Sequence, residues 1–378
     1  MRKEYLNFIK NIYKYNLIYI IKNLINKTIQ KFFLSKNKYP KRAEFIKSYY
    51  IKNVQQLDSK DNPAFIFKIN NEFKTLKINQ NWDELIDIND YEIRQSFHRF
   101  YWLNNKWDKK SINNLKILIN SWILKFNNDT EAWQSYTSSE RLFSIVYLLT
   151  KIYTHKQLIL FFKKDKVFNY LLIKTFNTLI YNIEYTKDGT SFNHVVNNYK
   201  GLILCSILLN KNKLIVECNK LFVKELKIIT EKDYFIREGS SHYQFIISKW
   251  IFDLKYFINY FKIKGFKNND SVFLKNIIKK SFFFLLKNLN MPFYGDISPD
   301  YSPKTLVSYF KNKNSKLFEK NLDYYNKDGI LFNYINYTRI NFRKWVVFIK
   351  HTDCSRDYFL DHSHEDESQV IIFYNNNP

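Results

Sequence analysis

The feature that most limits the fold is a long stretch of helical periodicity. From about residue 85 to 290, apolar residues recur at spacings of three and four, with short polar joints between the segments. Ser138 or Ser139 can cap one of these segments, because a serine oxygen accepts hydrogen bonds from free first-turn amides. The clearest segments cover residues 111–126, 138–153, 167–184, 194–209, 213–229 and 241–262. The pattern predicts a mainly α chain of stacked helical hairpins, without a fixed-period repeat.

The pattern changes after Pro292. Pro299, Pro303 and neighbouring polar residues predict a linker, and residues 335–349 then alternate like a strand. Residues 369–374 form another candidate strand. Two or three strands do not readily make a self-sufficient sheet. Either this β-part packs on the helical part or the sequence is truncated.

Charge points to an anionic partner. The 378 residues carry 60 Lys and Arg against 35 Asp and Glu, a formal net charge of +25. Such a field attracts nucleic acid, anionic lipid or acidic polysaccharide, although the lysines could also serve only to solvate the surface. A nucleic-acid-binding helical protein would rest on this charge alone, since no reader motif accompanies it. The six glycines form no phosphate-binding loop, so a nucleotide ligand is not expected.

The cysteines and the apolar runs indicate which covalent, metal and membrane features to expect. Three cysteines without a CxxC suggest neither a disulfide framework nor a thiolate metal site. No uncharged apolar run approaches the ~20 residues that span a bilayer, so we expect no transmembrane segment. Residues 1–34 could lie on an anionic membrane as a basic amphipathic helix, and no cleavable signal peptide is legible there.

The first polar segment of interest covers residues 191–201. It places Asn193 and His194 at the start of an apolar helix, where free amides and the positive end of the helix dipole suit a carboxylate or a developing oxyanion. The alternative is an asparagine N-cap followed by a hydrogen-bonded histidine.

The second segment covers residues 236–244 and includes Arg237, Glu238 and Tyr243 ahead of another apolar helix. A tyrosine can shuttle protons if nearby positive charge lowers its pKa from ~10. Capping serines and a partly buried tyrosine would explain the same residues without chemistry.

Two further segments are polar. Residues 291–296 approach a Gly-Asp turn at Asp296, which by itself is weak evidence. Residues 361–368 carry His362 and His364 just before a strand, and histidines two apart on an extended chain share a face. They could ligate a metal together, or one could enter a site while the other binds structurally; a solvated acidic loop is the alternative.

Taken in order, these segments resemble the heparinase II/III family of polysaccharide lyases. The matches are a W…R element from Trp133 to Arg141, then NHxxxNxKG, EGSxxY, PxxGD and HxHxD. They cover roughly residues 90 to 378. The resemblance implies an incomplete α/α toroid of helical hairpins followed by the start of an antiparallel β-sandwich. It also implies a carbon–oxygen lyase that cleaves an acidic, uronic-acid-containing glycan by β-elimination.

The resemblance also implies residue roles. Asn193 and His194 would face the uronate carboxylate, Tyr243 would be the acid/base group, and His362 a second proton-transfer candidate. These residues would converge on one groove. Glu238, Arg237, Arg141, Trp133 and Asp296 would form the substrate-binding set. His364 matches a structural zinc ligand, but the remaining ligands would lie beyond Pro378, so the zinc site would be incomplete; catalysis would require no cofactor.

The chain departs from the family pattern at two places. Gln244 stands where a histidine commonly follows the tyrosine, and residues 297–299 replace the usual acidic and glycine residues. A non-catalytic glycan-binding relative is therefore the alternative. Relatives suggest a periplasmic or exported protein, whereas the missing signal peptide suggests a cytoplasmic one.

The expected domains are a basic helical N-terminal extension and lead-in (1–85), the toroid (86–305) and the beginning of the sandwich (330–378).

Overall fold

The chain divides into two compact units, Met1–Asn219 and Lys220–Pro378. The structure, a computed structural model, describes residues 64–69, 72–77, 82, 91–101, 103, 112–185, 191–263, 271–298, 300–351 and 368–376. Within these residues no helix is both long enough and apolar enough to cross a membrane.

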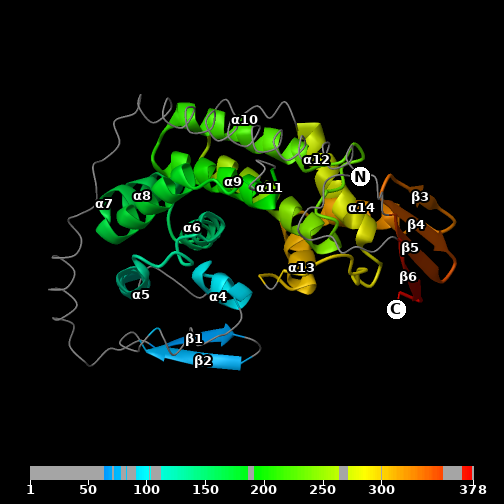
Figure 1. Cartoon of the computed structure of the whole chain (residues 1–378), viewed down its shortest axis with the longest axis horizontal. Helices are drawn as coiled ribbons and strands as arrows, with labels where there is room; N and C mark the ends of the chain where they lie inside the picture. Colours follow the sequence, from blue (N-terminus) through cyan, green and yellow to red (C-terminus); the bar gives the residue numbers. More distant parts are fainter. Residues whose placement is uncertain are drawn as a thin grey trace, which may run out of the picture. The chain divides into compact units, whose positions relative to one another are not determined.

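The first unit is built around helix α6 (Ser135–Leu149), which packs against α4, α8 and α9 (Figure 1). All but two residues of α6 and all but one residue of α9 are buried. A helix that is buried all round must satisfy its polar side chains inside the protein. The other helices are α4 (Tyr91–His98), α5 (Ile112–Phe126), α7 (His155–Lys164), α8 (Lys166–Tyr181), α9 (Asn193–Leu208) and α10 (Asn212–Ile228), which continues into the second unit.

The predicted helices are present, with ends that differ by a few residues. The predicted cap at Ser138 or Ser139 is wrong, because α6 begins a turn earlier at Ser135 with Gln134 as its N-cap, and both serines are buried inside the helix. Helix α7 was not predicted. It begins where Gln157 accepts a hydrogen bond from the backbone N–H of Thr154.

The described part of the N-terminal extension is not helical. Strands β1 (Ala64–Ile69) and β2 (Glu72–Lys77) pair antiparallel, with Ala64 opposite Lys77. Residues 1–34, the possible membrane-surface helix, lie outside the described residues.

The second unit joins a helical part to a sheet. Its helices are α11 (Ser241–Tyr260), α12 (Ser271–Ser281), the 3-10 turn η1 (Phe282–Phe284), α13 (Pro303–Lys313) and α14 (Ser315–Tyr325). The predicted linker after Pro292 is therefore partly wrong, since it contains α13 and α14. Pro303 occupies the first turn of α13. A backbone N–H has no partner within the helix at that position, so a proline is tolerated there, and the Ser302 side chain caps the helix.

Four antiparallel strands follow in the order β3-β4-β5-β6. The strand-like stretch at 335–349 is a hairpin, which turns at Arg343 with a positive φ of 55°. The strands are β3 (Leu331–Asn333), β4 (Tyr337–Phe342), β5 (Trp345–His351) and β6 (Ser368–Tyr374).

One face of the sheet packs on the helical part of the same unit. The Phe348 ring lies 5.9 Å from that of Phe283, and the buried Arg339 donates to the backbone oxygens of Phe283 and Leu285. The other face carries large apolar side chains that remain about half exposed, including Trp345 and Ile372. Apolar residues on both faces are typical of a sheet that is covered on both sides.

Candidate active site

Buried polar contacts join α6 to α9. The Glu140 carboxylate accepts hydrogen bonds from Nδ2 of Asn197 at 2.7 Å and from the Tyr101 hydroxyl at 2.7 Å. It also pairs with the Lys200 ammonium, which is fully buried. The structure thus brings together two segments that lie apart in the sequence, the Trp133–Arg141 element and residues 193–201.

Gly201 explains how closely these helices approach. A Cβ atom at this position would lie 2.6 Å from Oγ of Ser139 and 2.8 Å from Cδ1 of Leu179. Ser139 in turn donates a hydrogen bond to the backbone oxygen of Asn197 at 2.9 Å. The glycine of the NHxxxNxKG segment is therefore a packing requirement.

His194 alone among the residues of α9 is not buried. Its ring stacks on Phe192 with centroids 4.7 Å apart and lies 4.6 Å from the Tyr136 ring. The guanidinium of Arg99 lies 4.6 Å from that same tyrosine ring. The imidazole is thus held by aromatic rings while part of it remains accessible.

Glu184, which sequence reasoning missed, faces His194. Its Oε2 lies 3.6 Å from Nδ1 of His194 and accepts from the Tyr136 backbone N–H at 2.9 Å. Burial favours the neutral acid, but the contact with His194 and the hydrogen bonds from Asn198 and Tyr136 outweigh it and lower the pKa of Glu184. No motif marked this residue; only its position nine residues before Asn193 would have suggested it.

Asn193 is fully buried as the first residue of α9, and Phe192 is the N-cap. The asparagine N-cap considered above is therefore wrong. Side chains at this position lie beside the positive end of a 16-residue helix.

Trp133 and Arg141 lie in the interior of the first unit. Arg141 is fully buried and donates to the backbone oxygens of His98 and Ala132, and its guanidinium stacks on the Trp133 ring at 4.6 Å. The Trp133 indole donates to the backbone oxygen of Phe126. These contacts give both side chains a packing role in the described structure, and a substrate-binding role stays a prediction without structural support.

In the second unit, the start of α11 is fixed to the segment 292–301. Oγ of Ser240 donates to the backbone oxygen of Asp296, and Oγ of Ser241 to that of Pro292, both at 2.7 Å. The structure therefore brings together the EGSxxY and PxxGD segments, which only the family resemblance had linked.

His242 extends this connection. Its Nδ1 accepts from the backbone N–H of Ser298 at 3.1 Å, so Nε2 carries the proton and donates to the backbone oxygen of Tyr301 at 2.9 Å. Burial lowers the pKa of His242 to about 4, although the hydrogen bond to Tyr301 opposes the shift. The ring is therefore a neutral structural tie at physiological pH.

The remaining predicted residues of this unit lie in the same two segments as the His242 contacts. Tyr243 is half-buried on the first turn of α11, where its backbone N–H donates to Oγ of Ser240. Arg237 is exposed and pairs with Glu231 at 3.4 Å, whereas Glu238 is fully buried and Asp296 half-buried. Tyr243 and Arg237 are thus accessible.

Gln244 faces the interior. Its Oε1 accepts from the Ile236 backbone N–H at 2.8 Å, and its Nε2 donates to the Ile277 backbone oxygen at 3.0 Å. The glutamine at this position, a departure from the family pattern, therefore links the segment 236–244 to α12 inside the protein.

His362 and His364 lie outside the described residues. Within the described part of the chain, no group of three or more His, Cys, Asp or Glu side chains is arranged to hold a metal ion. The zinc hypothesis therefore stays a prediction. His194 belongs to the first unit and Tyr243 to the second, so their convergence also stays a prediction.

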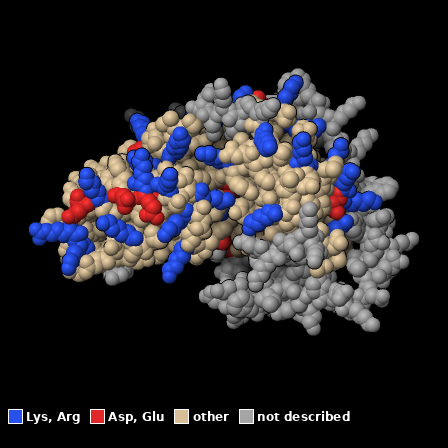
Figure 2. All heavy atoms as spheres, turned by 180° about the vertical axis from the view of Figure 1, so that it is seen from behind, with Lys and Arg blue, Asp and Glu red and all other residues tan. Residues whose placement is uncertain are grey.

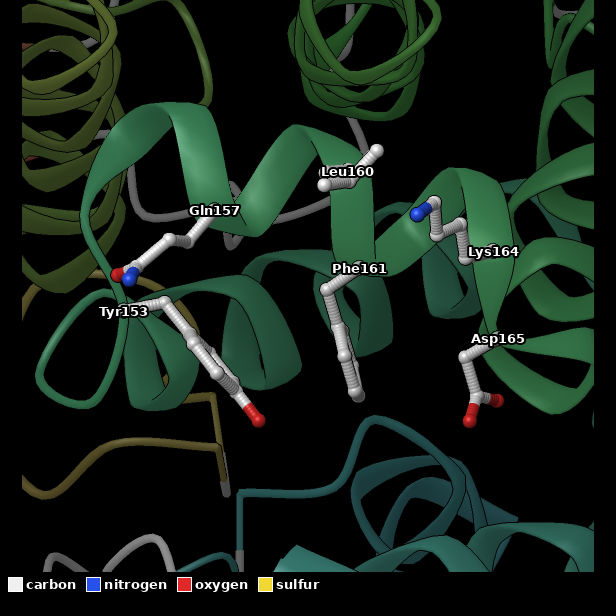
Figure 3. A pocket seen from close by; sticks show the side chains of 6 residues that line it. All are labelled: Tyr153, Gln157, Leu160, Phe161, Lys164 and Asp165. Atoms are coloured by element: carbon white, nitrogen blue, oxygen red, sulfur yellow. The ribbon is translucent and has the colours of Figure 1, made fainter.

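An open groove of about 420 Å³ lies elsewhere in the first unit, at the junction of α7 and α8 (Figure 3). The rings of Tyr153 and Phe161 stack there at 5.1 Å. Asp165 in its wall caps α8 and pairs with Lys116 at 2.7 Å. The 16 residues of α8, about 24 Å of helix, separate this groove from Glu184, so the groove is distinct from the Glu184–His194 pair.

Figure 2 shows lysine and arginine side chains spread widely over one face, whereas acidic side chains gather in a few places. This distribution agrees with the net charge of +25.

Comparison with known proteins identifies the fold class. No protein-family model and no curated protein sequence matches the chain. Among solved structures, heparinase III matches with a TM-score of 0.57 and 13% identity, covering 82% of this chain and 52% of heparinase III. The heparan sulfate lyase HepC from Pedobacter heparinus matches with a TM-score of 0.47 and 14% identity, covering 83% of this chain and 53% of HepC.

The chain therefore shares the heparinase III fold and spans about half the length of the solved structures it matches. The predicted fold class is confirmed: a mainly α chain, an incomplete α/α toroid followed by the start of an antiparallel β-sandwich.

Proposed function

We propose that this chain is a polysaccharide lyase that cleaves a uronic-acid-containing glycan by β-elimination. The observation that carries the proposal is His194, an accessible imidazole at the start of a buried helix in a chain with the fold of heparinase III. The name of that relative states a heparin-degrading activity, and the strongly basic surface suits a polyanionic substrate.

In the proposed first step, the uronate carboxylate binds at the N-terminal end of α9, beside Asn193 and His194, where the positive end of the helix dipole favours an anion. Neutralising this carboxylate makes the C5 proton more acidic, because charge that develops on the carboxylate oxygens in the transition state is then stabilised. The partly exposed imidazole of His194 lies at this end of the helix and can act as a base, whereas the buried Lys200 is already occupied by Glu140.

In the second step, Tyr243 removes the C5 proton, assisted by His194 or His362. The electron pair of the C–H bond forms the C4=C5 double bond, and the C4–O bond breaks. A tyrosine or histidine protonates the leaving oxygen. The products are an unsaturated sugar and a new hydroxyl end, and neither water nor a redox partner is consumed.

The test is the ultraviolet absorbance of the 4,5-unsaturated uronate after incubation with heparin, heparan sulfate, alginate, hyaluronan and chondroitin sulfate. We expect absorbance to rise with at least one glycan, and Tyr243→Phe to lower the rate about 100-fold or more. Tyr324→Phe, which removes an exposed hydroxyl on α14, is the matched control. Mass spectrometry excludes hydrolysis, which adds water to the product.

A non-catalytic glycan-binding protein is the second candidate, and it rests on the two departures from the family pattern, at Gln244 and at residues 297–299. It predicts retention on immobilised glycan without any unsaturated product. If DNA displaced the glycan at moderate salt as readily as heparin does, the positive charge alone would account for binding. The protein would then not be specific for glycans.

A further inference from the structure

Glu184 is held in place by a two-sided clamp from Asn198. Nδ2 of Asn198 donates to Oε2 of Glu184 at 3.1 Å, and Oδ1 of Asn198 accepts from the Glu184 backbone N–H at 2.9 Å. The Tyr136 backbone N–H donates a second hydrogen bond to Oε2. The carboxylate is therefore fixed from two helices, α9 and α6.

The clamp and the imidazole share one face of α9. His194 and Asn198 are four residues apart, so their side chains lie one above the other on the helix. The clamp thereby aims the carboxylate at Nδ1 of His194, 3.6 Å away. Each partner remains partly accessible, with exposed side-chain fractions of 28% for His194 and 19% for Glu184.

We propose that Glu184 is a positioning residue for His194: the clamped carboxylate keeps the proton of the neutral ring on Nδ1 and leaves Nε2 to face the substrate. The tautomer of an imidazole is set by the partner of its other nitrogen, and a fixed carboxylate is an effective partner. This inference rests on the proposed function, because the role of Nε2 toward substrate matters only if the chain binds a uronate.

The charged and titratable neighbours of the pair come from three elements. Tyr136 of α6 contacts the ring, Arg99 after α4 lies over Tyr136, and Tyr91 of α4 is close enough that Glu184 contributes to the raised pKa of its phenol. The contact with His194 and the hydrogen bonds from Asn198 and Tyr136 outweigh burial and keep the carboxylate ionised, as the lowered pKa of Glu184 indicates.

The experiment compares the wild type with Glu184→Gln, which keeps the shape and removes the charge. Histidine side chains are labelled with ¹⁵N, and His194→Gln identifies the signals of His194. We expect Nδ1 to show the protonated-nitrogen shift in the wild type and to move toward the unprotonated shift in Glu184→Gln. Asn198→Ala should give a shift in the same direction, because it removes the clamp alone.

Lyase rates provide the second readout. We expect kcat/KM of Glu184→Gln to fall roughly 10- to 100-fold, as for partners that orient a functional histidine. Glu319→Gln, at an exposed position of α14, is the matched control and should change neither readout.

Unchanged His194 shifts in both Glu184→Gln and Asn198→Ala, with melting temperatures like the wild type, would overturn the inference. If the wild type produces no unsaturated sugar from any glycan, the proposed function fails, while the nitrogen shifts still decide whether Glu184 sets the tautomer.

Discussion

The carboxylate of Glu140 and the ammonium of Lys200 form an ion pair in which both side chains are almost completely buried. The pair connects α6, which carries Arg141, to α9, which carries Asn193 and His194. A buried charge that loses its partner is strongly destabilising, because the remaining charge has neither water nor a counterion.

Lys200→Met should therefore lower the free energy of unfolding by about 3–5 kcal/mol. Lys213→Met, at an exposed position of α10, should change it by less than about 0.5 kcal/mol. Urea unfolding followed by circular dichroism measures both. Equal midpoints for the two variants would show that the buried pair contributes nothing to stability.

Gly201→Ala should destabilise the protein by about 1–3 kcal/mol, because the new methyl group overlaps Ser139 and Leu179. Ser139→Gly in the same chain should recover part of this loss, which a double-mutant cycle detects as a coupling energy.

Gly329 is the matched comparison. It has a φ of +71° and nothing within 4 Å of an added Cβ, so Gly329→Ala should cost only the backbone strain of about 1–2 kcal/mol. Gly329→Asn should cost less than Gly329→Ala, since asparagine tolerates this conformation, whereas Gly201→Asn should cost more than Gly201→Ala.

Two buried histidines should make stability depend on pH. Burial lowers the pKa of His242 to about 4 and that of His98 to about 3, against about 6.5 in an unfolded chain. The unfolded state binds these protons first, so the contribution of both histidines is complete above pH 6.5 and is lost as pH falls toward 4 for His242 and toward 3 for His98. Between pH 6 and 5 the free energy of unfolding should fall with a slope approaching about 2.7 kcal/mol per pH unit for the two groups.

His242→Gln should reduce that slope by about half, because one of the two protons is then missing. Urea midpoints at several pH values between 7.5 and 5 give the slopes. A variant that keeps the wild-type slope would mean that His242 titrates normally in the folded protein.

Local patterns in the sequence were sufficient for most helices but not for the site. Apolar spacing identified α6 and α9, whose apolar side chains form part of the core. It missed α13, because Pro303 suggests a loop unless the serine before it is recognised as a cap. It also merged β4 and β5 into one strand, since the turn uses Arg343 in place of glycine or asparagine.

Within the candidate site, the ordered motifs placed His194 and Tyr243 at helix starts, as the structure has them. They did not reveal Glu184 or the Glu140–Lys200 pair, because these depend on contacts between segments 10 to 60 residues apart that no spacing rule encodes. A motif shows which residue types occur together, but burial decides whether a charged side chain can face a ligand.

The two arginines predicted to bind substrate provide a direct test of that distinction. Arg141→Met should lower the free energy of unfolding by about 1–3 kcal/mol, because it leaves the buried oxygens of His98, Ala132 and Ser138 without their donor. Arg237→Met, at an exposed position, should leave stability within about 0.5 kcal/mol and raise KM for an acidic glycan. Thermal unfolding and steady-state kinetics on each variant separate the two effects. A stable Arg141→Met protein with a raised KM would show instead that Arg141 reaches the substrate, and that α6 opens in solution to expose it.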